Sequence, residues 1–370
     1  MRQRSRVRRR SWHDERMVAF LRFLPTSVRT VFAVALVLLP TARAQAIGDG
    51  HDVFLDAVGA VVTGERYVVG PLTMTTDVAG DVLVGVTLRG LLDPAGIAAA
   101  SATFAVATGY GDGIRQPLAS FLAERAESYV GQGPVPIRVE GYQLELDVTT
   151  GVLIGTPVAA MSLSLPRVSE AAFGPPVAIL GDPDAAILIR VFNDFECPFC
   201  KRYAEQILPT LKQSVLASED VALAFHHFPL NNIHANAEPA AVTSQCVQDL
   251  YGTDVFWRYH DRIFERQAAW GSLGDPYPYF VRLLSDTPEV VNAAGSAEQA
   301  SSEVTACIEQ GDALADVRSA TNRGVLLGVQ GTPTVFVGGH RLNDFDSPEG
   351  YVRLIRLERA LAGLEGGPAQ

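Results

Sequence analysis

The sequence has little cysteine, a deficit of basic charge and no long apolar run, and each shortage excludes a class of protein. Four Cys in 370 residues are too few for a disulfide-dense miniprotein. No apolar run approaches the ~20 residues of a spanning helix, which argues against a multi-span membrane protein. Acidic residues outnumber basic ones 41 to 30, so a nucleic-acid-binding surface is not expected. The remaining composition is that of a globular protein long enough for two domains.

The charge is divided unevenly along the chain. Residues 1–46 contain ten Arg and two acids, a net charge of +8, whereas residues 47–370 have a net charge of −19. A short apolar stretch, Val31–Leu39, follows the basic end, and small-x-small cleavage sites surround Ala44. This order is typical of a secretory signal peptide, with Met17 as an alternative start; the competing interpretation is a basic cytosolic arm. We therefore predict an exported protein of the periplasm or another extracytoplasmic space, where disulfides persist.

Residues 47–167 contain no cysteine and are predicted to form a small α+β domain. Asp93-Pro94 provides an N-cap and a first helical residue for a helix over residues 97–107. Glycine-bounded β-branched runs and alternating segments predict strands at residues 67–69, 82–88, 137–139, 142–148 and 161–165. No metal-ligand spacing, phosphate loop or nucleophile elbow is present, so the sequence indicates no function for this domain. Glycine and proline residues then predict a linker over residues 168–184.

A second domain is predicted over residues 185–365. It opens with a nearly continuous apolar run, residues 185–192, which suits a central buried strand. A polar corner leads to Cys197-Pro198-Phe199-Cys200, and apolar residues then recur at a helical period. Because proline is favoured at the first helical position, Cys197 is expected at a helix N-terminus, with Cys200 one turn further along.

This spacing of two cysteines is suited to disulfide exchange. The thiolate is the nucleophile, and the N–H groups and dipole of a helix N-terminus favour its negative charge, so Cys197 is expected to be the activated cysteine. Cys200 is close enough to form an intramolecular disulfide with it. The alternative is half of a zinc site, but the remaining cysteines, Cys246 and Cys307, are single and far apart. The strand, turn and helix favour redox chemistry, with no metal and no cofactor beyond the redox-active disulfide.

A second motif, Gly331-Thr332-Pro333-Thr334, precedes a β-branched run, and the proline at this strand's entry is a candidate for a cis peptide bond. Together with it, residues 192–201 (FNDFECPFCK) resemble the active-site segment of the DsbA-like branch of the thioredoxin superfamily. The resemblance covers about residues 180–365. It also includes Phe228-Pro229-Leu230 with His234, Ala240-Ala241, Phe256-Trp257 and Gly328-Val329-Gln330.

The resemblance implies a thioredoxin fold split by a helical insertion at about residues 234–328, and a closing helix over residues 347–362. The whole chain is then an α/β thioredoxin domain preceded by a smaller α+β domain. Thr332 and Pro333 would form a cis-proline loop that faces Cys197. This loop, with Pro198 and Phe199, would bind substrate.

The resemblance also implies a structural disulfide between Cys246 and Cys307. It would close a loop of about 60 residues, worth on the order of 4 kcal/mol in the chain-entropy model. The alternative is two separate buried thiols.

Two departures from the family limit what can be transferred. Many relatives have a buried acid six positions before the first cysteine, where this chain has Val191. Either proton transfer uses water and an outer carboxylate such as Asp194 or Glu196, or it is slower. The competing interpretation of these two acids is that they are simply solvated loop charges. Pro198 and Phe199 provide no imidazole between the cysteines, so we expect a less oxidising couple than in the most oxidising members.

The leading functional prediction is an extracytoplasmic thiol:disulfide oxidoreductase that donates disulfides, with Cys197 as nucleophile and Cys200 as resolving cysteine. Its expected partners are exported cysteine-containing proteins and a membrane redox partner that recycles the pair. One alternative is a reductase or isomerase of DsbC/DsbG type, whose N-terminal domain would mediate dimerisation. Another is a non-catalytic client-binding chaperone. We expect neither a nucleic-acid nor a metal partner.

Overall fold

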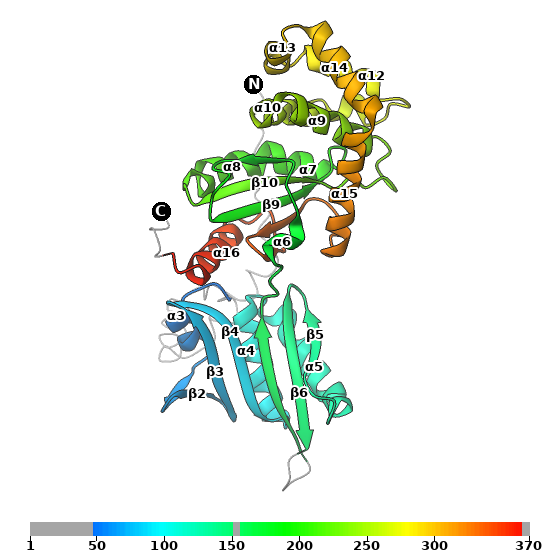
Figure 1. Ribbon diagram of the computed structural model, residues 1–370. Helices are drawn as coiled ribbons and strands as arrows, with labels where there is room; N and C mark the ends of the chain where they lie inside the picture. Colours follow the sequence, from blue (N-terminus) through cyan, green and yellow to red (C-terminus); the bar gives the residue numbers. More distant parts are fainter. Residues whose placement is uncertain (1–46, 151–155, 365–370) are drawn as a thin grey trace, which may run out of the picture. The chain divides into compact units, whose positions relative to one another are not determined.

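The computed structural model describes residues 47–150 and 156–364, so the predicted signal peptide, residues 1–46, lies outside the described residues. Within the described ranges, no helix is both long enough and apolar enough to cross a membrane. The described residues form two separate sheets, one of seven strands and one of five (Figure 1).

The first sheet has seven strands in the order β1-β2-β3-β4-β7-β6-β5, and every neighbouring pair is antiparallel. Its strands are β1 (Val61–Thr63), β2 (Arg66–Val69), β3 (Leu72–Ala79), β4 (Val82–Leu91), β5 (Val135–Val139), β6 (Tyr142–Thr150) and β7 (Pro157–Ser164). The associated helices are α3 (His51–Ala57), α4 (Pro94–Thr108), α5 (Asp112–Arg125) and the short 3₁₀ helix η1 (Ala126–Tyr129).

This first domain is α+β, as predicted. The Asp93 side chain accepts a hydrogen bond from the Gly96 N–H at 2.7 Å, and Pro94 occupies the first turn of α4, which confirms the predicted helix start. Buried and partly exposed residues alternate along β6, so one face of the sheet forms the core with α4 and α5.

The second sheet has five strands in the order β12-β11-β9-β10-β8. Only β9 and β10 are parallel to each other; the other pairs are antiparallel. The strands are β8 (Ala178–Leu180), β9 (Ile187–Asn193), β10 (Val221–His227), β11 (Thr334–Val337) and β12 (His340–Leu342). As predicted, the apolar run that precedes the cysteines is the central strand, β9.

The predicted linker, residues 168–184, is not only a connection. It contains the short helix α6 (Glu170–Phe173), and β8, which pairs with β10 at one edge of the second sheet. The second sheet therefore begins before residue 185. A three-residue strand among glycine and proline residues is too short to show a period, which is why the sequence pattern did not reveal it.

The helix after the cysteines is interrupted by one wide turn. It consists of α7 (Pro198–Arg202), the π-helical turn η2 (Tyr203–Ile207) and α8 (Leu208–Gln213), followed by the 3₁₀ helix η3 (Val215–Ala217). Pro209 lies in the first turn of α8 and has no N–H to donate, which accounts for the break in the regular hydrogen-bond ladder.

The predicted helical insertion lies between β10 and β11 (Figure 1). Its helices are α9 (Ala237–Tyr251), α10 (Thr253–Glu265), α11 (Gln267–Trp270), α12 (Tyr277–Ser285), α13 (Pro288–Ala294), α14 (Ala297–Gln310) and α15 (Asp312–Leu326). Cys246 of α9 and Cys307 of α14 form a disulfide, the pairing that the resemblance implied. The closing helix α16 (Pro348–Leu361) is capped by Ser347.

Two adjacent histidines of β10 lie in the core of the second domain. His226 stacks on Phe192, and His227 lies among the rings of Phe195 and Phe225. Burial is the main cause that lowers the pKa of each histidine to about 3, with smaller contributions from Arg190 and Arg323 for His226 and from two neighbouring histidines for His227. Neither ring nitrogen of His227 has a hydrogen-bond partner among the described residues. These histidines are therefore neutral packing groups and have no acid–base role near neutral pH.

The buried histidines predict a loss of stability in acid. The unfolded chain protonates His227 near its ordinary pKa of about 6.5, but the folded chain does so only near 3. Stabilisation is therefore fully present above about pH 6.5 and is lost as the pH falls toward 3. For one such histidine, the free energy of unfolding should fall by about 2 kcal/mol between pH 7 and pH 5.

His227→Phe should reduce this pH-dependent loss by about 2 kcal/mol, because the substitution removes the titrating group from an apolar site. Urea unfolding followed by the fluorescence of Trp257 and Trp270, both in the insertion, measures it. Phe225→Leu is the matched control, since it perturbs the same ring cluster and should lower stability equally at both pH values. An unchanged pH dependence in His227→Phe would contradict the prediction.

Candidate active site

The two cysteines lie where β9 turns into α7. Cys197 is the N-cap residue of α7 and Pro198 is in its first turn, which confirms the predicted position. Cys200 is completely buried and Cys197 is 4% exposed, and neither forms a disulfide in this structure. In contrast, Pro198 is exposed and Phe199 is 57% exposed. The turn therefore presents an apolar ring to solvent beside a shielded pair of sulfur atoms.

The two thiols are unequal in acidity. A hydrogen bond with the Cys200 thiol is the main cause that lowers the pKa of Cys197 to about 6, assisted by the Thr332 side chain and the N–H groups at the start of α7. Burial partly opposes this effect. In Cys200, burial and the adjacent Cys197 sulfur raise the pKa well above its ordinary value. At neutral pH the pair therefore holds one thiolate, on Cys197, and one thiol, on Cys200.

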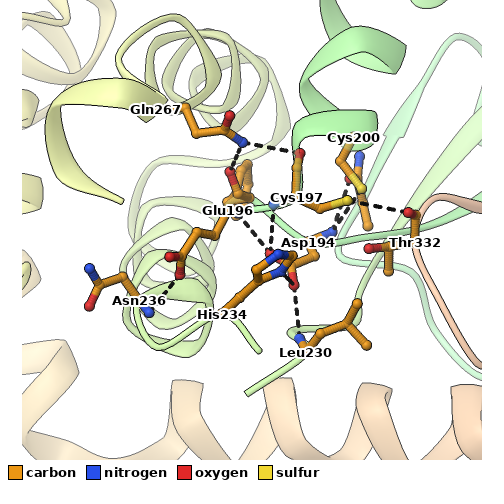
Figure 2. Close-up of polar contacts among 11 residues, drawn as sticks. Asp194, Glu196, Cys197, Cys200, Leu230, His234, Asn236, Gln267 and Thr332 are labelled. Atoms are coloured by element: carbon orange, nitrogen blue, oxygen red, sulfur yellow. Dashed lines mark hydrogen bonds and ion pairs between the residues drawn. The ribbon is translucent and has the colours of Figure 1, made fainter. Parts of the chain in front are cut away.

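The loop before β11 lies against Cys197, as the resemblance implied. The Thr332–Pro333 peptide bond is cis. Cys197 Sγ is 3.3 Å from the Thr332 carbonyl oxygen, to which it donates when the thiol is protonated (Figure 2). Pro333 is buried, and Thr332 is partly exposed. The turn and the loop thus meet at one sulfur atom, although they are far apart in the sequence.

The interpretation of Asp194 and Glu196 as solvated loop charges is wrong. The Asp194 carboxylate is fully buried and accepts hydrogen bonds from the N–H groups of Glu196 (2.7 Å) and Cys197 (3.2 Å). The Leu230 N–H, at 2.8 Å, is a third backbone donor. Glu196 is partly buried and accepts from the Asn236 N–H at 2.7 Å, and burial raises the pKa of its carboxyl group. Asp194 therefore holds the turn together and is not an outer carboxylate.

Sequence reasoning missed three residues of the insertion and its entry. Gln267 donates to the carbonyl oxygens of Phe195 (2.7 Å) and Cys197 (3.1 Å). His234 contacts the Asp194 carboxylate through Nδ1 at 2.7 Å (Figure 2). The Asn236 side-chain amide donates to the carbonyl oxygens of Trp270, the last residue of α11, and of Gly271 and Leu273, which follow it. Of these residues, His234 was part of the family resemblance but had no assigned role, and no pattern distinguished Gln267.

Among the described residues, no second pair of ligands accompanies Cys197 and Cys200 to complete a zinc site. Cys246 and Cys307 are joined to each other by their disulfide. Among residues 47–150 and 156–364, no group of three or more His, Cys, Asp or Glu side chains is placed to hold a metal ion.

Comparison with known proteins identifies relatives of this part of the chain. A family model described as "Thioredoxin" matches residues 175–356. The "Probable disulfide bond formation protein D" of Bacillus cereus is 30% identical over 171 residues, which are 45% of this chain and 73% of that protein. The "Disulfide bond formation protein D" of Bacillus subtilis is 25% identical over 174 residues, 45% of this chain and 70% of that protein.

Among solved structures, BdbD from Bacillus subtilis in its oxidised form is 21% identical, with a TM-score of 0.40, and the match covers 54% of this chain and 98% of that one. The α-DsbA1 of Wolbachia pipientis is 18% identical, with a TM-score of 0.41, and the match covers 50% of this chain and 94% of that one. The residues matched by the family model contain the strands of the second sheet, its helical insertion and both cysteines of the active-site turn. Through this part, the chain belongs to the DsbA-like thiol:disulfide oxidoreductases of the thioredoxin superfamily.

Proposed function

We propose that this oxidoreductase donates disulfides to exported cysteine-containing proteins, with Cys197 as the nucleophile and Cys200 as the resolving cysteine. The observation that carries the proposal is the unequal pair, in which a Cys197 thiolate lies beside a fully buried Cys200 thiol. Stabilising the thiolate stabilises the reduced form, and a stabilised reduced form makes the disulfide form the better oxidant.

The exchange proceeds in two thiol–disulfide exchange steps. A client thiolate attacks Sγ of Cys197 in the oxidised enzyme, the Cys197–Cys200 bond breaks, and Cys200 leaves and takes up a proton as a thiol. A second client thiolate then attacks the client sulfur of the mixed disulfide, and Cys197 leaves as a thiolate. Two client thiols are oxidised, the enzyme disulfide is reduced, and one of the two client protons is released to solvent. The low pKa of Cys197 makes it a good leaving group in the second step.

The client would bind around Cys197, as the resemblance implied. Phe199, with its exposed ring, and the exposed Pro198 lie next to the nucleophile on the turn. Thr332 and Pro333 approach the same sulfur from the other side. These four residues are the proposed substrate-binding set, and the apolar ring suits an extended chain with apolar side chains.

We place this activity outside the cytoplasm, with a membrane redox partner that reoxidises the pair. Two observations support this proposal: the basic, apolar and small-residue order of the leader, and the Cys246–Cys307 disulfide, a type of bond that persists in oxidising compartments.

Trapping the redox state in the native cell tests the direction of exchange. After an acid quench and labelling with a large maleimide, a donor should carry Cys197 and Cys200 mostly as a disulfide, because its partner reoxidises it. A reductase or isomerase should carry two labels instead. A Cys197→Ser/Cys200→Ser variant is the control, since any label it takes reports on Cys246 and Cys307. A mostly reduced pair would overturn the donor assignment.

A further inference from the structure

A buried charge lies at the base of the active-site turn. The Asp194 carboxylate has no solvent exposure, and three backbone N–H groups donate to it, one of which belongs to Cys197 itself. These donors fix the Asp194 carboxylate at the base of the turn, next to the residue whose sulfur becomes an anion during exchange.

The Asp194 carboxylate and a thiolate on Cys197 carry charges of the same sign and would repel each other. A buried carboxylate without a counter-charge is costly, and its field disfavours a neighbouring thiolate. Among the described side chains, His234 is the one that pairs with Asp194: its Nδ1 is 2.7 Å from the carboxylate, and its side chain is 16% exposed. Figure 2 shows this imidazole beside the carboxylate at the turn that begins α7.

The surroundings of His234 favour its cationic form. Burial alone would lower its pKa, but the hydrogen bond to Asp194 and the negative charges of Asp194, Cys197 and Glu196 raise it above the ordinary value. Within the described part of the chain, these three groups are the ones whose charges raise the pKa of the imidazole.

We propose that His234 is a positioning residue whose positive charge neutralises Asp194 and thereby allows Cys197 to exist as a thiolate. Asp194 holds the turn, and His234 removes the electrostatic penalty that this anion would impose on the nucleophile. This inference rests on the proposed exchange. The positive charge of His234 would matter in the second step, in which the second client thiolate displaces Cys197 and Cys197 leaves as a thiolate.

The test is a double-mutant cycle in which the pKa of Cys197 is measured for each variant. Thiolate absorbance against pH, measured on the reduced protein, should show that pKa rise by about one unit in His234→Gln, because Asp194 is then uncompensated. The double variant Asp194→Asn/His234→Gln lacks both charges and should return the pKa toward the wild-type value. Asp194→Asn alone should lower it, which provides a second measurement if His234→Gln folds poorly.

The same pattern of effects across the variants is expected in the redox equilibrium with glutathione. Loss of thiolate stabilisation in His234→Gln should shift the equilibrium constant about tenfold toward the disulfide form, or about 30 mV to more negative potential. His51→Gln is the matched control, because His51 is also a partly buried, hydrogen-bonded histidine but lies against Thr76 in the first sheet.

The outcomes separate this inference from the proposed function. If His234→Gln loses stability but keeps the wild-type pKa of Cys197 and the wild-type equilibrium, His234 has only a structural role. Failure of the double variant to restore the pKa would also overturn the charge argument. Neither result affects the exchange reaction, which depends on whether Cys197 itself is required.

Discussion

Replacing Cys197 with serine is expected to lower the rate of disulfide exchange about a thousandfold or more, to the background rate. A serine hydroxyl is not ionised near neutral pH and cannot form a mixed disulfide with a client. The wild-type residue, by contrast, has a pKa of about 6 and is largely thiolate at pH 7. The measurement is the rate at which the oxidised protein forms the disulfide in a reduced peptide that contains two cysteines.

Cys200→Ser is the matched control, because it removes the other sulfur and leaves the nucleophile in place. Its reduced form should attack a disulfide-bonded client and remain attached, since no second enzyme thiol can release it. A covalent enzyme–client complex, which reductant cleaves, should therefore accumulate with Cys200→Ser and be absent with Cys197→Ser. Full exchange by Cys197→Ser would favour the chaperone alternative, in which the thioredoxin domain only binds clients.

Removing the Cys246–Cys307 disulfide is expected to lower the free energy of unfolding of the second domain by about 4 kcal/mol. The bond joins α9 to α14 and spans 61 positions of the sequence. Closing so long a loop restricts the unfolded chain strongly, which is the main stabilising effect in the chain-entropy model. The variant Cys246→Ala/Cys307→Ala, compared with wild type by urea unfolding, measures the difference.

The design needs a control for the other pair of cysteines. In Cys197→Ser/Cys200→Ser the structural disulfide is the only one left, so adding reductant should produce the same loss of about 4 kcal/mol. Below its unfolding transition, Cys246→Ala/Cys307→Ala should still exchange disulfides, because neither residue belongs to the turn or the cis-proline loop. Equal stability with and without the bond would contradict the prediction.

Local patterns predicted local structure well. Pro198 fixed the start of α7 and therefore the N-cap position of Cys197, and Asp93-Pro94 did the same for α4. The apolar run before the cysteines became the central strand β9. Each of these features depends on neighbours within a few positions, where propensity and hydrophobic period are informative.

Contacts over long distances in sequence were not predictable in the same way. Asp194 looked like a loop charge because its partners, Leu230 and His234, are 36 and 40 positions away. Gln267 contacts the Cys197 carbonyl oxygen across 70 positions, and nothing about an isolated glutamine indicates such a role. The strand order of the first sheet, with β4 beside β7, likewise depends on tertiary packing.

The contact between Cys197 and Thr332 has a consequence for the order of assembly. These residues are 135 positions apart, with the whole insertion between them. A chain delivered from its N-terminus exposes Cys197 and Cys200 long before the loop that faces them arrives. During that interval β9 has β10 as a partner, but its other edge is open until β11 is delivered. Cys246 likewise has no disulfide partner until Cys307 is delivered, 61 positions later. On the proposed route outside the cytoplasm, each new copy therefore arrives with unpaired cysteine thiols, as a client of the proposed donor activity does.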